Sequence, residues 1–96
     1  MNYPAIVSPE GRRILIIFPD LPECQAIASV NDNFLKVAQD ALVNCLKTLL
    51  RKEEEPLPPS EKLRIRGTAT ALIVPVPDEL ARTLEGRWRR RSINKS

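Results

Sequence analysis

The stretch ECQAIASVNDNFLKVAQDALVNCLKTLLRKEEE, residues 23–55, decides the fold, because all nine prolines of the 96-residue chain lie outside it. A proline inside a helix removes a backbone hydrogen bond and clashes with the preceding turn. A long helix therefore fits only here. Apolar residues recur in this stretch at the spacing of an amphipathic helix: Phe34, Ala38, Ala41, Leu42, Cys45, Leu46 and Leu49.

We expect this helix to run from about Val30 to Lys52. Ser29 or Asn31 is the expected N-cap, because a short polar side chain can accept the first backbone N–H bonds of a helix. The proline-rich segment 57–60 follows the Glu53–Glu55 run and ends the pattern. The apolar stripe of the helix is predicted to face the core.

Three β-rich runs precede the helix. Residues 3–7 and 13–18 flank a Pro-Glu-Gly turn and predict a hairpin. The turn Pro19-Asp20-Leu21-Pro22 then reverses the chain into a short third strand over residues 24–28. The order of these runs predicts a meander of three antiparallel strands.

A fourth strand is expected over residues 66–76, which are rich in Thr, Ile, Val and Leu. Pro75 and Pro77 both lack an amide on the same side of this strand, so that side should be an outer edge of the sheet. A short final helix should begin near Asp78, with Leu80, Leu84 and Trp88 on one stripe.

The order βββαβα predicts a two-layer α+β domain with one long helix packed on one face of a sheet. Ninety-six residues leave no room for a second independent fold. We therefore divide the chain into a domain over residues 1–77 and a short C-terminal helix with a basic tail over residues 78–96. The helix stripe Leu80, Leu84 and Trp88 carries more apolar surface than a short terminal helix needs, so it is the expected oligomerisation surface.

The composition argues against catalysis, since the chain has no histidine and thus lacks the commonest general base. Cys24 and Cys45 lie 21 residues apart, which fits neither a CxxC redox pair nor half of a zinc site. We predict that both are unpaired, buried thiols in a reducing compartment. The expected protein is cytoplasmic, with no metal, cofactor, small-molecule substrate, signal peptide or membrane span.

Charge is distributed unevenly along the chain. Residues 1–60 hold eight acids against six bases, whereas residues 61–96 hold four acids against nine bases. Four of these bases are Arg87, Arg89, Arg90 and Arg91. They suit nucleic acid or an acidic partner, and they equally suit the C-terminal end of a helix, where the macrodipole favours cations.

Several segments in order resemble the N-terminal domain of HicB-type antitoxins. These are Tyr3–Val7, Glu10-Gly11, Phe18–Pro22 followed by Cys24, the helix, and the closing segment Pro56–Ser60. The resemblance covers about residues 3–60. It implies a partial RNase H-like βββαβ fold with sheet order 3-2-1-4, usually in an oligomer.

The resemblance also implies a function. Family members bind a small mRNA-cleaving toxin, HicA, and cover its active site, so inhibition needs no chemistry. The metal-dependent nucleases of the RNase H-like fold hold their ions with carboxylates on the first and fourth strands. Residues 3–7 and 68–76 contain no acid, so we do not expect a nuclease.

Two departures from the family pattern concern DNA and the loops. Many members carry a C-terminal DNA-binding module, but only 12 residues follow Leu84, so operator binding is doubtful. Glu23 and Ala28 stand where the family often has glycine.

Asp20 and Glu23 form an acidic loop that suits a basic, RNA-binding toxin, and they are the candidate toxin-binding residues. Asp20 equally suits a simple turn. The alternative function is a small nucleic-acid-binding regulator that uses the arginines of the tail. Trp88 either packs on the domain or on a second subunit, or stacks on a base.

Overall fold

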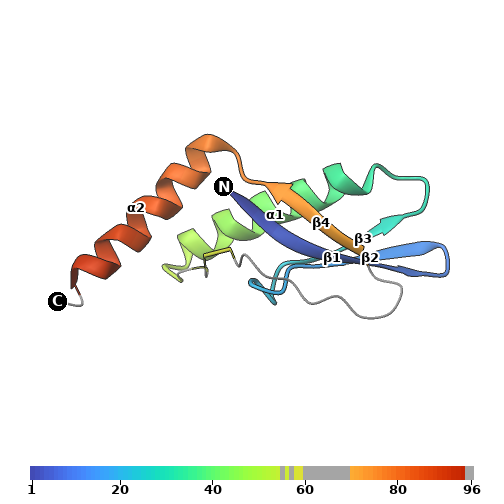
Figure 1. The fold of residues 1–96 in the computed structure, drawn as a ribbon, viewed down its shortest axis with the longest axis horizontal. Coiled ribbons are helices and arrows are strands. Elements are labelled where there is room, and N and C mark those ends of the chain that lie inside the picture. Colours follow the sequence, from blue (N-terminus) through green and yellow to red (C-terminus); the bar gives the residue numbers. More distant parts are fainter. Residues whose placement is uncertain (55, 57, 60–69, 95–96) are drawn as a thin grey trace.

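The computed structural model describes residues 1–54, 56, 58–59 and 70–94. The described chain forms an α+β fold in which four strands and two helices follow in the order βββαβα (Figure 1). The elements are β1 Asn2–Glu10, β2 Arg13–Ile17, β3 Gln25–Ser29, α1 Phe34–Arg51, β4 Thr70–Pro75 and α2 Asp78–Asn94.

The sheet is antiparallel throughout and has the strand order β3-β2-β1-β4. This confirms the expected α+β class, the order 3-2-1-4 and the edge position of the fourth strand. Residues 66–69, the beginning of the predicted fourth strand, lie outside the described residues. The register aligns Val7 with Ile16 and Tyr3 with Val74, so these side chains share one face of the sheet.

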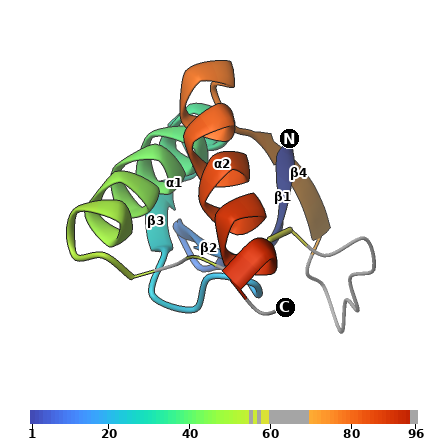
Figure 2. The same cartoon turned by 90° about the vertical axis from the view of Figure 1, so that its left-hand side faces the viewer.

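Helix α1 packs on that face, whereas α2 projects beyond the end of the sheet and joins the core only through its first half (Figures 1 and 2). The core joins the inward side chains of β1, β2 and β4 to one stripe of α1 and to the first half of α2. Its largest fully buried members are Tyr3, Phe18, Ile16, Leu21, Leu42, Leu46, Leu84, Val74 and Cys24. Ala38, Leu42, Leu46 and Leu49 are the buried residues of α1, in agreement with the predicted helical spacing.

Helix α1 begins four residues later than expected. Asn33 is the N-cap, and its side-chain oxygen accepts the N–H of Lys36 at 3.3 Å. The predicted caps are therefore wrong. The N–H of Ser29 donates to Asp32 Oδ2, and the N–H of Asp32 donates to the Ser29 carbonyl, both at 2.9 Å. Residues 29–32 therefore form a turn, and the helix begins after it.

Helix α2 also differs from the expectation, since it has 17 residues and is not short. The Pro77 carbonyl accepts the N–H of Ala81 at 2.9 Å, so Asp78 is the first helical residue and Pro77 precedes it in the cap position. Proline is well placed before the first turn because no intrahelical partner exists for its missing N–H.

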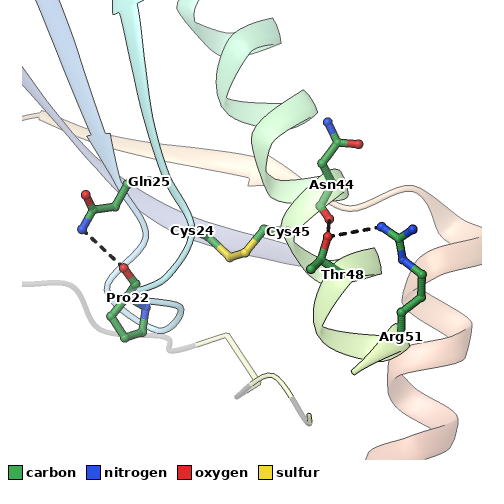
Figure 3. The surroundings of a disulfide bond; sticks show 7 residues. All are labelled: Pro22, Cys24, Gln25, Asn44, Cys45, Thr48 and Arg51. Atoms are coloured by element: carbon green, nitrogen blue, oxygen red, sulfur yellow. Dashed lines mark hydrogen bonds between the residues drawn. A yellow bond between two sulfur atoms is a disulfide. The ribbon is translucent and has the colours of Figure 1, made fainter. Parts of the chain in front are cut away.

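The two cysteines are bonded to each other, and the prediction of unpaired thiols is wrong. Cys24 and Cys45 form a disulfide with their Cα atoms 5.7 Å apart (Figure 3). Sequence spacing cannot reveal this pair, because the loop before β3 folds back against the middle of α1. The bond joins that loop covalently to the helix.

Helix α1 ends in a Schellman motif without glycine. The N–H of Glu54 donates to the Leu49 carbonyl at 2.9 Å, and the N–H of Glu53 donates to the Leu50 carbonyl at 3.2 Å. Glu53 has a φ of 59°, the left-handed conformation that glycine adopts without steric cost. The helix end is therefore closed at the expense of backbone strain at Glu53.

Replacing Glu53 by glycine should stabilise the protein. Glu53→Gly relieves the left-handed strain, and we expect the free energy of unfolding to rise by about 1 kcal/mol in urea titrations. Lys52→Gly is the matched control, since Lys52 has a φ of −82° and gains nothing from glycine. Equal effects of the two substitutions would contradict this account of the helix end.

Two leucines of α1 provide a test of the core. Leu42 is fully buried whereas Leu35 is 42% exposed on the same helix. Leu42→Ala should lower the free energy of unfolding by about 2–5 kcal/mol, because it leaves a cavity in the core. Leu35→Ala should cost less than about 1 kcal/mol. Similar denaturation midpoints for the two variants would show that this face of the helix is assigned wrongly.

Candidate partner-binding site

The acidic loop, residues 18–24 between β2 and β3, is held by apolar side chains at every third position. Phe18, Leu21 and Cys24 are at most 2% exposed. Two backbone hydrogen bonds repeat with the same spacing, from Leu21 N–H to the Phe18 carbonyl at 2.9 Å and from Cys24 N–H to the Leu21 carbonyl at 2.8 Å. The side chains between these anchors are left toward the surface.

The two acids of this loop differ in their exposure to solvent. Glu23 is exposed, whereas Asp20 is half-buried. Burial raises the pKa of the Tyr3 phenol well above its usual value, and the negative charge of Asp20 raises it further. Asp20 therefore lies within electrostatic reach of the core, and Glu23 is the more accessible acid of the loop.

A second feature adjoins the acidic loop and was missed by sequence reasoning. The outer face is the side of the sheet that α1 does not cover, and the register places apolar residues of all four strands on it. Ile73 is 57% exposed and Ile27 is 62% exposed. The register places eight apolar residues on this face, of which Ile27, Ala71, Ile73 and Pro75 are exposed, Ile6, Leu15 and Ile17 are half-buried, and Pro4 is buried.

The outer face is continuous with the acidic loop. Ile17, the last residue of β2, pairs with Gln25 of β3 on one side and with Ile6 of β1 on the other. Both Ile17 and Gln25 flank the loop in sequence. The charged residues of these strands, Glu10 and Arg13, pair with each other at the opposite, hairpin end. The middle of the outer face therefore carries no charge.

A sequence signal for this face exists. An antiparallel sheet with one solvated face normally alternates apolar and polar residues. The segments RILII at 13–17 and ALIV at 71–74 do not alternate. Strands of this kind are typical of sheets buried on both faces, and the described helices cover only one.

The predicted oligomerisation residues take part in the core of the single chain. Leu84 is fully buried and Leu80 is 8% exposed. Trp88 is half-buried, and its indole N–H donates to the Pro56 carbonyl at 2.9 Å. These contacts account for the stripe within one chain, and oligomerisation through it stays a prediction.

Two of the four predicted arginines of α2 have described side chains. Arg87 is half-buried and Arg89 is exposed, while the side chains of Arg90 and Arg91 lie outside those that the structure describes. The hydrogen bond of Trp88 uses the polar atom of its ring and fixes the ring against the domain. This leaves the role in nucleic-acid binding as a prediction.

A shallow groove of about 590 Å³ lies between α1 and α2, lined by Val43, Leu50, Pro77 and Leu80 with Lys47 and Glu79 at its rim. Across residues 1–54 and 70–94, no group of three His, Cys, Asp or Glu side chains could hold a metal ion. Neither described helix is long and apolar enough to cross a membrane.

Comparison with known proteins yields a likeness of fold. No protein-family model matches the chain, and no curated protein sequence matches it. A chain of a solved structure, described as "HicA3 and HicB3 toxin-antitoxin complex", is similar with a TM-score of 0.67 and 19% sequence identity. The alignment covers 80% of this chain and 99% of that chain. At this identity the two chains share the fold.

The pKa of Tyr3 predicts how the protein responds to alkali. The unfolded chain releases the phenol proton near pH 10, whereas the folded chain keeps it to higher pH. The free energy of unfolding should therefore fall as the pH rises above about 10, by about 1.4 kcal/mol per pH unit. Tyr3 is the sole tyrosine, so ultraviolet absorbance of tyrosinate follows it directly.

Two variants control this titration. Tyr3→Phe should remove the absorbance change, and Asp20→Asn should lower the pKa of Tyr3 in the folded protein because it removes a raising charge. Ionisation of Tyr3 near pH 10 in a protein that is still folded would contradict its burial.

Proposed function

We propose that the chain is an antitoxin of HicB type that binds a HicA-type mRNA-cleaving toxin and covers its RNA-binding surface. The observation that carries this proposal is the uncharged, apolar outer face bordered by the acidic loop. The likeness of fold to a chain of a toxin–antitoxin complex supports it. We assign the βββαβ unit to the partial RNase H-like class, as the resemblance implies.

The charges of the site suit such a toxin. A surface that binds RNA carries basic side chains, because it must hold phosphates. Glu23 is exposed at the border of the outer face and provides an opposite charge without the cost of burial. Asp20 adds to the same negative field from its half-buried position.

The outer face supplies the main contact. Uncharged side chains at the centre of an interface and charged ones at its rim form the usual arrangement of protein–protein contacts. Ile73 and Ile27 are the side chains of this face with the most surface left to bury. Inhibition by this mode is occlusion and requires no catalytic group in the antitoxin, so the proposed protein is not an enzyme.

A second candidate function is nucleic-acid binding through α2. Its supporting observation is the exposed Arg89 next to the arginines at 90 and 91. The engaged indole of Trp88 argues against base stacking. If the tail binds DNA, the affinity should fall steeply with salt and Arg89→Glu should reduce that salt dependence.

The proposal is tested by measuring binding to a purified HicA-type toxin. Glu23→Lys should slow association and weaken binding by about 1 kcal/mol, because it reverses a charge at the rim. Ile73→Lys should weaken binding by about 2 kcal/mol or more through faster dissociation, since it places a charge within the apolar contact. Kinetic binding assays and growth rescue on co-expression provide the two readouts.

Matched variants lie away from the proposed site. Glu85→Lys reverses an exposed acid on α2, and Leu35→Lys charges an exposed leucine on α1. Both should bind the toxin as the wild type does. The proposal is wrong if Leu35→Lys abolishes toxin silencing while Ile73→Lys and Glu23→Lys preserve it.

A further inference from the structure

The disulfide joins the acidic loop to α1, and this position gives it a regulatory consequence. Glu23 directly precedes Cys24, so the bond to Cys45 fixes the backbone next to the exposed acid of the proposed site (Figure 3). The two backbone hydrogen bonds of the loop run between loop residues, from Leu21 to Phe18 and from Cys24 to Leu21. They shape the loop and do not attach it to α1.

We propose that the Cys24–Cys45 disulfide is a redox switch that holds the acidic loop in its toxin-binding position. This inference rests on the proposed function and concerns the regulation of the same site. With the bond intact, the loop is preorganised, and binding costs little conformational entropy. With the bond reduced, Leu21 remains the apolar anchor of the loop, and the segment from Pro22 to Gln25 gains freedom.

The chemistry of the switch is thiol–disulfide exchange with a dithiol reductant of the thioredoxin class. Cys45 is partly exposed whereas Cys24 is 2% exposed. The reductant thiolate therefore attacks Cys45 Sγ, forms a mixed disulfide and expels the Cys24 thiolate, which takes up a proton. The second thiol of the reductant displaces Cys45, so the chain gains two electrons and two protons and the reductant leaves as a disulfide.

The direction of the switch follows from the fold. The backbone hydrogen bonds of the sheet and of α1 do not involve the disulfide. The reduced protein therefore keeps the outer face and its apolar contact with the toxin. What it loses is the fixed position of the charged loop beside that contact. Reduction should therefore weaken toxin binding without abolishing the fold, so that a larger fraction of the toxin is free in a reducing environment.

The experiment compares the oxidised and the reduced 96-residue chain, with a catalytically inactive HicA-type toxin as the probe. Thiol titration should count two cysteines after reduction, and amide exchange of residues 20–25 should become faster in the absence of toxin. The affinity for the toxin should fall by about tenfold. The variant Cys24→Ser with Cys45→Ser should behave as the reduced protein does and should not respond to reductant.

The outcomes separate the switch from the proposed function. Equal, tight binding by the oxidised and reduced chains would overturn the switch and leave the antitoxin role intact. No binding by either form would overturn both. If the double variant does not fold, the reduced wild type, checked by circular dichroism, decides the question. Unchanged amide exchange of the loop on reduction would also overturn the switch, independently of the toxin.

Discussion

The packing of α1 on one face of the sheet is the interaction on which the rest of the structure depends. Leu42 and Leu46 are fully buried in the cluster that holds Tyr3, Ile16 and Val74. The 18 residues of α1 are long enough, at about 1.5 Å per residue, to cover one side of a sheet of this size. The first half of α2 completes that cover with Leu80 and Leu84. No described helix covers the other face of the sheet.

The strand edges are the other places where a partner could join the sheet, and both are partly blocked. The N–H of Val76 donates to the Met1 carbonyl at 3.0 Å. In β4, the backbone N–H and C=O groups of every second residue therefore point toward β1, and those of the residues between point away from the sheet. Pro75 is one of the outward residues and has no N–H, while its carbonyl accepts Gln39 Nε2 at 3.4 Å. At the opposite edge, formed by β3, the Asp32 carboxylate accepts the N–H of Ser29, and the backbone N–H of Asp32 donates to the Ser29 carbonyl. Contact through the face of the sheet is left as the more open route.

Much of the fold could be predicted from the sequence, because its signals are local. The absence of proline over residues 23–55 and the apolar spacing from Ala38 to Leu49 identify α1. The two prolines after Val74 identify the edge strand. The errors concern contacts between distant residues or competition among neighbouring polar groups. The pairing of Cys24 with Cys45 is a tertiary contact, and Asn33 became the cap because Ser29 and Asp32 bond to each other.

Of the candidate site, the acidic loop could be predicted from the sequence, and the outer face was missed. Acids between prolines identify the loop, but the depth of Asp20 depends on its position beside Tyr3 in the folded chain. The outer face is signalled only by the missing alternation of residues 13–17, because β-propensity alone does not say which side of a strand is exposed. Trp88 was ambiguous because its partner, the Pro56 carbonyl, lies 32 residues away.

Folding of the chain does not explain the chemistry of the outer face. The side chain of Ile73 is 57% exposed, so a polar residue there would cost the isolated domain little stability. The proposed toxin contact accounts for apolar residues at such exposed positions. An uncharged face attracts no charged partner over distance, so in the proposed complex electrostatic steering comes from Glu23 in the adjoining loop. In that proposal the acidic loop mainly sets the rate of association, and the outer face mainly sets the rate of dissociation.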